Sequence, residues 1–455
     1  MASEPPRGVE PPEDSRLPWL RSQRPVPRYL LRPLERFLNL EAGSASLLLG
    51  AAVAALLWSN LATESYESFW STKLELRLGP LVLEEDLRHV VNDLLMAIFF
   101  YVVALEVKRE TLFGSLREPR SAAVPFAAAL GTMVGAAATY LAVNIVGGGD
   151  LRGWAIPIAT DIAFALGVLG LVGRRARAEL RAFLLTLAVV DDLGTIAVIA
   201  VFYSTGISLA WLAAAAGLTI IVVAIQRLGV RSLVPYVTLA GLLWIAVFES
   251  GVHATIAGVV LGFLTPATAF YARQETGEAI SEQLGEIADS TDWELSETTA
   301  LETSRLAREA ASPLVRMENL LHPWSAYMVL PVFALANAGV PISLAALSAA
   351  LGGSEGLGIV LGLVIGAPLG GFLLAWGLAR LTPAHLSEGL DWPAIGGVAP
   401  LKGIGFTVAI FISELAFADA LLRNQAKLAI LLASVTAAVI GVLILVARGR
   451  ALGPA

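Results

Sequence analysis

Long apolar segments dominate the chain and limit what it can fold into. A helix needs about 20 apolar residues to cross the hydrocarbon core of a bilayer, and about twelve segments reach or approach that length. They lie roughly at residues 42–60, 88–107, 121–145, 155–173, 182–203, 208–225, 233–248, 252–266, 324–346, 356–379, 394–417 and 427–447. Only 15% of the residues are charged, against about 25% in soluble proteins. We therefore expect an all-α integral membrane protein of about twelve transmembrane helices.

Three polar regions flank or interrupt this expected membrane domain of residues 41–447. Residues 1–40 are rich in Arg and Pro, which predicts a disordered cytoplasmic arm. Residues 267–312 carry a run of acidic side chains, which predicts a solvated loop whose acidity says little about substrate. Residues 448–455 form a short tail. The chain has no cysteine, which excludes disulfides and thiolate metal sites, and we expect no cofactor.

Basic residues in short loops predict the orientation, because cytoplasmic loops are enriched in Lys and Arg. Two clusters decide it: Lys108, Arg109, Arg117 and Arg120, and then Arg174, Arg175, Arg177 and Arg181. Placing both clusters inside puts both termini in the cytoplasm.

One segment on the opposite, outer side has the pattern of a β-hairpin. Residues 73–78 alternate polar and apolar side chains, Gly79-Pro80 predicts a turn, and a second apolar run follows, so the hairpin would span 72–86. An isolated two-stranded hairpin is marginally stable in water, so pairing with a second copy would stabilise it and produce a homodimer. The alternative is a loop lying on the membrane surface.

Two adjacent carboxylates, Asp191 and Asp192, fall in the middle of an apolar segment. Each charge costs about 2.5–3.5 kcal/mol at the centre of a membrane helix, so intramembrane acids are typical of function. Neighbouring side chains point about 100° apart, so one aspartate can face an ion cavity while the other faces a neighbouring helix. Carboxylates placed together favour keeping one proton at neutral pH. A proton that a small cation can displace is what an exchanger requires; the alternative is a structural pair hydrogen-bonded between helices.

Two other segments are interrupted within the membrane. Pro157 breaks the fourth, where Thr160 and Asp161 introduce oxygen ligands. The eleventh is broken around Pro400 and Gly403. Interrupted helices in corresponding positions of two repeats are a strong sequence sign of a midplane binding site. Asp161 could equally cap the second half of its helix, and the two roles are compatible.

Six strings make a family resemblance plain. They are ATDIAFALG at 159–167, LAVVDDLGTIA at 187–197, VNDLLMAIFFYVVALEVKRE at 91–110, SGVHATIAG at 250–258, LHPWSAYMVLPVFALANAGV at 321–340 and GIGFTVAIFIS at 403–413. The chain resembles the NhaA family of bacterial sodium/proton antiporters from about residue 40 to 447. The resemblance implies inverted repeats, two interrupted helices that cross, and a multi-pass protein of the bacterial inner membrane. It also implies extrusion of sodium or lithium in exchange for protons by alternating access, under pH regulation.

The resemblance also implies roles for individual residues. Asp192 would be the principal sodium ligand, with Asp191 beside it and Asp161 and Thr160 at the crossing. The residues matching the pH-regulatory set are Glu106, Glu110, Glu318, His253 and Asp93. Read from the residues alone, Glu106 and Glu110 could form a hydrated helix end, and Glu318 could be an acid at the start of a helix. His253 could be a packing or capping residue.

One departure from the family pattern concerns charge. The family lysine in the tenth span is replaced by Ala367, while Lys402 appears just before the break in the eleventh. A buried ammonium needs an anionic partner, so we expect Lys402 to supply the missing charge and to pair with Asp161. The alternative is that Lys402 extends to the membrane surface.

Two other functional classes fit the pattern less well. An intramembrane aspartyl protease needs two acids converging from different helices, whereas Asp191 and Asp192 are neighbours on one. A sodium-coupled organic-anion symporter would use the same architecture, but it needs convergent donors for the solute. Antiport remains the first hypothesis, which makes the chain a transporter and not an enzyme.

Overall fold

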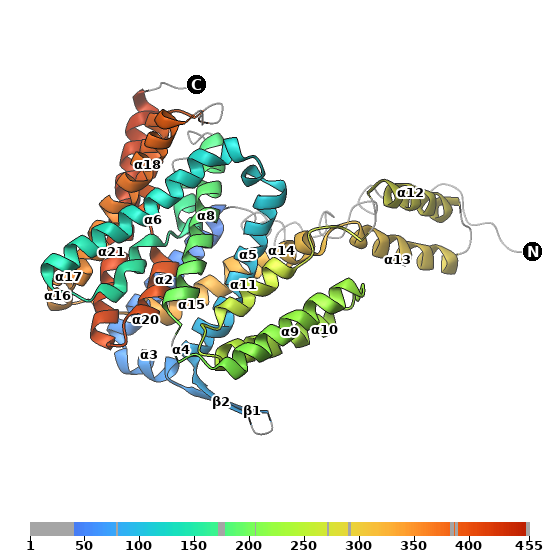
Figure 1. Ribbon diagram of the computed structural model, residues 1–455, viewed down its shortest axis with the longest axis horizontal. Helices are drawn as coiled ribbons and strands as arrows, with labels where there is room; N and C mark the ends of the chain where they lie inside the picture. Colours follow the sequence, from blue (N-terminus) through green and yellow to red (C-terminus); the bar gives the residue numbers. More distant parts are fainter. Residues whose placement is uncertain are drawn as a thin grey trace, which may run out of the picture.

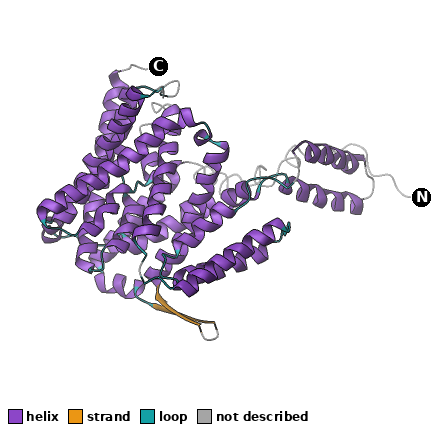
Figure 2. Ribbon diagram, viewed as in Figure 1, coloured by secondary structure: helices purple, strands orange, loops and turns teal. Residues whose placement is uncertain are grey.

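The computed structural model describes residues 41–78, 81–171, 178–204, 206–270, 273–289, 293–382, 386 and 390–451. Within these ranges it is a bundle of long helices with one two-stranded sheet (Figures 1 and 2). Seven helices are long and apolar enough to cross a membrane, and nine spans result if each of two bent pairs counts as one. The predicted fold class, an all-helical multi-span membrane protein, is confirmed.

The helices before the acidic segment correspond to the first eight predicted spans. They are α2 (Glu41–Leu61), α3 (Thr63–Trp70), α4 (Leu87–Val90), the π-helix η4 (Val91–Leu95), α5 (Met96–Phe113), the 3₁₀ turn η5 (Ser115–Arg117), α6 (Pro119–Gly147), the 3₁₀ helix η6 (Leu151–Ile158), α7 (Ile162–Leu171), α8 (Ala178–Phe202), α9 (Leu209–Arg227), α10 (Leu233–Glu249) and α11 (Thr255–Leu264). The seventh and eighth predicted segments could have been one kinked helix. They are two helices, because the chain turns at Gly251, whose φ is +77°.

The remaining helices complete the bundle. They are α12 (Arg273–Asp289), α13 (Trp293–Glu309), α14 (Pro313–Trp324), the π-helix η8 (Ser325–Val329), α15 (Leu330–Asn337), α16 (Leu344–Gly352), α17 (Ser354–Leu361), the π-helix η9 (Gly362–Gly366), α18 (Ala367–Leu381), α19 (Trp392–Val398), the 3₁₀ helix η10 (Ala399–Gly403), α20 (Phe406–Ala416) and α21 (Ala420–Ala451). Three π-helical segments interrupt the spans, a feature frequent at functional sites.

Both predicted helix breaks are present. The axes of η6 and α7 differ by 41°, and those of the α19–η10 unit and α20 by 45°. Pro157 lies in η6 and Pro400 in η10, next to the two breaks. Each break leaves main-chain groups free to bind partners outside their own helix.

Glycines allow α6 and α18 to approach at backbone distance. Gly131 and Gly135 on α6 face Gly366 and Gly370, so that a Cβ on any of the four would collide with the opposing main chain. Small residues spaced by four are typical of close helix contacts in membranes. This crossing packs α6 tightly against the η9–α18 segment.

The predicted β-hairpin is confirmed. Strands β1 (Lys73–Leu78) and β2 (Leu81–Asp86) pair antiparallel, with Lys73 opposite Asp86 and Leu78 opposite Leu81. The Lys73 ammonium contacts the Glu84 carboxylate at 2.6 Å and lowers the pKa of that carboxyl. The hairpin extends away from the helices at the end where α5 begins (Figure 1). We call this end the hairpin side.

Some sequence predictions lie outside the described residues. They are the arm of residues 1–40, the hairpin turn, and Arg174, Arg175 and Arg177. The acidic segment, expected as a loop, contains the helices α12 and α13, which pack against each other and extend away from the bundle (Figure 1). A hydrogen bond of 2.9 Å from Thr303 to Gln283 joins them.

Candidate functional site

The two broken spans meet at their breaks through main-chain and side-chain hydrogen bonds. The Asp161 amide donates to the carbonyl of Ile404 at 2.7 Å, and the Thr160 hydroxyl lies 3.1 Å from the carbonyl of Lys402. Unpaired backbone groups are costly in a membrane. Polar groups at the first break therefore form hydrogen bonds with carbonyl groups at the second. We call Thr160, Asp161, Lys402 and Ile404 together the crossing unit.

Asp161 binds both broken spans with its side chain. One carboxylate oxygen accepts from the amide of Phe164 at 3.0 Å, which caps α7. The other accepts from the Thr407 amide at 3.2 Å and from its hydroxyl at 2.6 Å, at the start of α20. The capping role and the crossing role expected for Asp161 thus occur together.

Asp191 on α8 is buried next to Thr160 and Lys402 at the two breaks. Its carboxylate forms an ion pair with Lys402 and accepts hydrogen bonds from Thr132 at 3.1 Å and Thr160 at 3.4 Å. Lys402 is 3% exposed. The expectation that Lys402 is buried and paired is confirmed, and the alternative that it extends to the surface is wrong.

The partner expected for Lys402 was wrong, because it is Asp191 and not Asp161. The oxygens of Asp161 are already bound by two main-chain amides and a hydroxyl at the ends of α7 and α20. Lys402 instead lies in η10, where its ammonium reaches α8.

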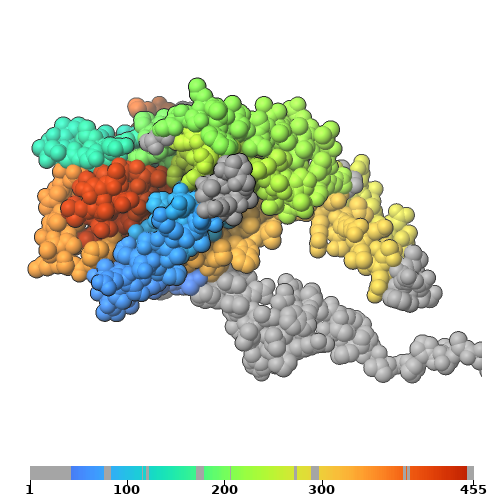
Figure 3. Space-filling view, turned by 90° about the horizontal axis from the view of Figure 1, so that it is seen from below, coloured from blue at the N-terminus to red at the C-terminus, as the bar shows by residue number. Residues whose placement is uncertain are grey.

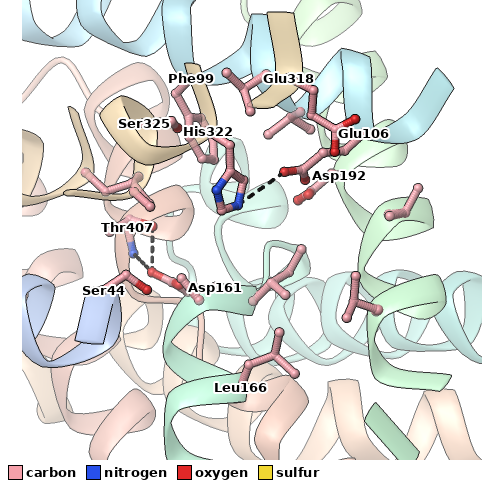
Figure 4. A pocket seen from close by; sticks show the side chains of 18 of the residues that line it. Ser44, Phe99, Glu106, Asp161, Leu166, Asp192, Glu318, His322, Ser325 and Thr407 are labelled. Carbon is pink, nitrogen blue, oxygen red and sulfur yellow. Dashed lines mark hydrogen bonds and ion pairs between the residues drawn. The ribbon is translucent and has the colours of Figure 1, made fainter. Parts of the chain in front are cut away.

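Asp192 points into a cavity of about 610 Å³ (Figure 4). It makes no hydrogen bond or ion pair with another residue in the described part of the chain. Asp161, Thr160 and Thr407 line the same cavity. Adjacent aspartates therefore face different surroundings, as their spacing on a helix predicts.

The far end of the cavity, opposite the hairpin side, is lined by charged groups at the end of α5 and on α14. Glu106 and Glu110 belong to α5, and Glu318, 8% exposed at its side chain, pairs with Arg109 at 2.7 Å. His322 lies 3.7 Å from Glu106 (Figure 4). We call this end the cavity mouth.

Two residues of the predicted regulatory set lie elsewhere. Asp93 in η4 and His253, between α10 and α11, approach each other at 3.8 Å near the hairpin side. Neither lines the cavity. The predicted set is thus divided between two ends of the protein.

Four residues at the site were not predicted from the sequence to belong to it: Thr132, Thr407, Arg109 and His322. Thr407 directly follows the second break, which is a usable signal. Thr132 has no such signal in the sequence, because it is one of many polar residues within apolar segments. It reaches the site because α6 packs against α8.

The cavity is lined by oxygen groups of the kinds that bind small hard cations and protons. Carboxylate and hydroxyl oxygens are the ligands that hard cations prefer. Asp192 supplies a carboxylate that other protein groups leave available, and Thr160, Thr407 and Asp161 add oxygens nearby.

Comparison with known proteins agrees with this chemistry. Residues 35–445 match the Na+/H+ antiporter 1 family. The chain is 45% identical to the Na(+)/H(+) antiporter NhaA 2 of Myxococcus xanthus, covering 95% of this chain and 93% of that protein. It is 44% identical to the Na(+)/H(+) antiporter NhaA of Rhodopirellula baltica, covering 92% and 94%. The length of the matches and the sequence identity together establish the family. The chain belongs to the NhaA family and is a multi-pass Na+/H+ antiporter, a transporter and not an enzyme.

Proposed function

We propose that Asp192 is the residue that binds sodium and protons alternately. The observation that carries this proposal is its carboxylate, which is buried in the cavity and has no hydrogen-bond or ion-pair partner among the described residues. An unpaired buried carboxylate is costly as an anion, so it favours a bound cation or a bound proton. Sodium and proton then compete for one group, which couples their movements.

Asp191, Asp161 and Thr160 complete the proposed ion site with different tasks. Asp191 is the second sodium ligand, held by Lys402 until the ion arrives. Asp161 and Thr160 keep the two breaks in register and offer oxygens at the cavity wall. Lys402 compensates charge in place of the family lysine, whose position is occupied by the buried Ala367.

The direction of transport follows from the proposed orientation. With the cavity mouth facing the cytoplasm, the ion site is open to the inside, and both termini are cytoplasmic. Sodium or lithium leaves the cell as external protons enter by alternating access across the bacterial inner membrane, which contributes to pH homeostasis. Lithium suits the same hard oxygen ligands, whereas the larger potassium ion should be transported poorly.

We propose that the charged groups at the cavity mouth regulate exchange with pH. Glu106, Glu110 and Glu318 lie where a change in protonation would alter the Arg109 and His322 contacts. His253 and Asp93 form a second pair at the other end of the protein. Regulation at two ends would let pH on each side act separately.

We propose that the protein is a homodimer joined through its hairpins. A two-stranded sheet leaves main-chain groups unpaired along both of its edges, and such edges favour pairing with another strand. The sheet of β1 and β2 extends beyond the helices, where a second copy can reach it (Figure 1).

The ion site is tested by replacing Asp192 with Asn and measuring sodium-induced pH changes with a fluorescent probe in everted vesicles. The amide keeps the shape of the side chain but cannot exchange a proton, so exchange should be lost while insertion is preserved. Asp191→Asn should be comparably severe if the two carboxylates share the ion.

Asp150→Asn is the matched control, because Asp150 caps the main chain at Arg152 outside the site. It should retain exchange. Activity of Asp192→Asn close to that of the unmutated protein would contradict the assignment.

A further inference from the structure

A stripe of three residues along α20 connects the ion site to the hairpin side. Thr407, Phe411 and Glu414 are spaced four and three residues apart, so they lie on one face of the helix. Thr407 binds Asp161 at the cavity. Phe411 lies one turn farther from the cavity mouth, and Glu414 one turn beyond that.

Phe411 is completely buried in a cage of rings from other segments of the chain. Its ring centroid lies 5.7 Å from that of Phe100 on α5, 6.1 Å from Phe333 on α15 and 5.1 Å from His253. These distances are typical of favourable ring contacts. One side chain from α20 thus fills a space that three other segments enclose.

The cage lies about one helical turn from residues that line the cavity. On α5 Val103 lines the cavity and Phe100 belongs to the cage; on α15 Leu330 lines the cavity and Phe333 belongs to the cage. Each pair is three residues, or about one turn, apart. Phe411 follows Val408, another cavity residue, in the same way.

Charged residues lie next to the cage on the hairpin side. Glu414 pairs with Lys427, which is 5% exposed, and lies 3.3 Å from Arg423. A carboxylate near a helix C-terminus is unfavourable for the helix dipole, so the cations around Glu414 compensate it and join α20 to its neighbours.

Segments from both halves of the chain meet on the hairpin side (Figures 1 and 3). There the C-terminal segment that includes the start of α21 lies beside the N-terminal segment of α3 (Figures 1 and 3).

We propose that Phe411 is the gate residue on the hairpin side of the ion site. In this structure it closes the cavity toward that side while the mouth is open, and it must leave its cage in each exchange cycle. The proposal rests on the proposed alternating access. Rings exclude water between the cavity and the Asp93–His253 pair, so removing the Phe411 ring would leave a space with polar groups at both ends, where water can enter.

The absence of native cysteine makes the gate directly testable. A single thiol is introduced as Ala326→Cys, at a cavity position outside the ion site. The Ala326→Cys protein is treated with a membrane-impermeant thiol reagent in vesicles of each orientation, so that the reagent reaches either the mouth side or the hairpin side. With Phe411 intact and no sodium gradient, the thiol should react from the mouth side far more than from the hairpin side. Adding Phe411→Ala should raise labelling from the hairpin side several-fold.

Phe417→Ala is the matched control, because Phe417 is also buried at the end of α20 but packs near Gly153, away from the cage. It should leave the sidedness of labelling unchanged. Phe411→Leu, which keeps an apolar side chain in the cage, should stay close to the unmutated protein. Retained labelling from the mouth side shows that each variant is folded.

The second readout is a proton leak through proteoliposomes in the absence of sodium, which Phe411→Ala should increase several-fold over Phe417→Ala. Unchanged sidedness and unchanged leak in a folded Phe411→Ala protein would overturn the gate. Because labelling measures access and not exchange, it separates this failure from a failure of Asp192 as the ion site.

Discussion

Lys402 and Asp191 form a buried ion pair between η10 and α8, two segments that contribute to the proposed ion site. Removing one partner of a buried pair leaves an unpaired charge and costs about 3–5 kcal/mol, whereas replacing both partners with apolar groups can be nearly neutral. The pair is therefore as much a structural contact as a functional one, and stability and transport must be measured separately.

Lys402→Ala should lower the stability of the protein by roughly 3–5 kcal/mol, because Asp191 is left buried without its cation. Exchange should also become electroneutral, since the site then loses the ammonium that balances its carboxylates. Thermal unfolding in detergent and the effect of an imposed membrane potential in proteoliposomes measure the two consequences.

The double variant Lys402→Met with Asp191→Asn is the control for stability. It should melt at a higher temperature than Lys402→Ala, because no unpaired charge remains. If Lys402→Ala has an unaltered melting temperature and unaltered voltage dependence, Lys402 does not compensate charge at this site.

At the scale of elements, close backbone contact joins α6 to the η9–α18 span. Gly135 faces the main chain at Gly366 and Gly370, and neither neighbour can move without moving its helix. Ala367 begins α18 directly after this contact. The close contact between α6 and the η9–α18 span thus leaves little room for larger side chains there.

Gly135→Val should destabilise the protein by about 1–3 kcal/mol or more, because the added side chain meets backbone. Thermal unfolding and the yield of inserted protein measure the effect. Gly217→Val is the matched control: it places the same residue in a helix where no atom lies within 4 Å of the new Cβ. Equal melting temperatures for the two variants would show that the crossing tolerates expansion.

The hairpin is the second element with a testable role. Truncating residues 73–85 should give monomers in detergent and leave transport largely intact, because the ion site lies in the helices. Glu84→Gln, which weakens the contact with Lys73 but keeps both strands, should remain dimeric. An unchanged dimer after truncation, on size-exclusion chromatography, would place the interface elsewhere.

Some of these elements could be predicted from the sequence and others could not. The intramembrane Asp191 and Asp192, and the breaks near Pro157 and Pro400, were predictable because charge and Pro in an apolar helix have few explanations. The partner of Lys402 was not, because it depends on how each helix is rotated about its axis. The α12–α13 helices were missed because an acidic composition does not by itself distinguish a surface helix from a loop.

At the scale of the whole molecule, the described residues place clusters of titratable groups at both ends, with the proposed ion site between them. The cavity mouth has Glu106, Glu318 and their cationic neighbours, and the hairpin side has Asp93, His253 and the Glu414 cluster. The acidic α12–α13 segment extends from the bundle, where Arg231 pairs with Glu309.

Deleting residues 275–310 should change little except the response to pH and salt. The segment is mostly polar and its helices pack mainly against each other. Activity against pH, measured at two ionic strengths in everted vesicles, tests this expectation. Loss of folded protein would mean that the segment supports the membrane domain.

The hydrogen bond from the Asp161 amide to Ile404 has a consequence for hydrogen exchange. Amides at helix breaks normally exchange early, because they lack the ladder of bonds that slows exchange elsewhere. Here the amide of Asp161 is bonded to the other broken span, and its carboxylate holds the amide of Thr407. Both amides should therefore exchange as slowly as those of intact spans, so that the two most irregular segments of the backbone behave as one of its most rigid parts.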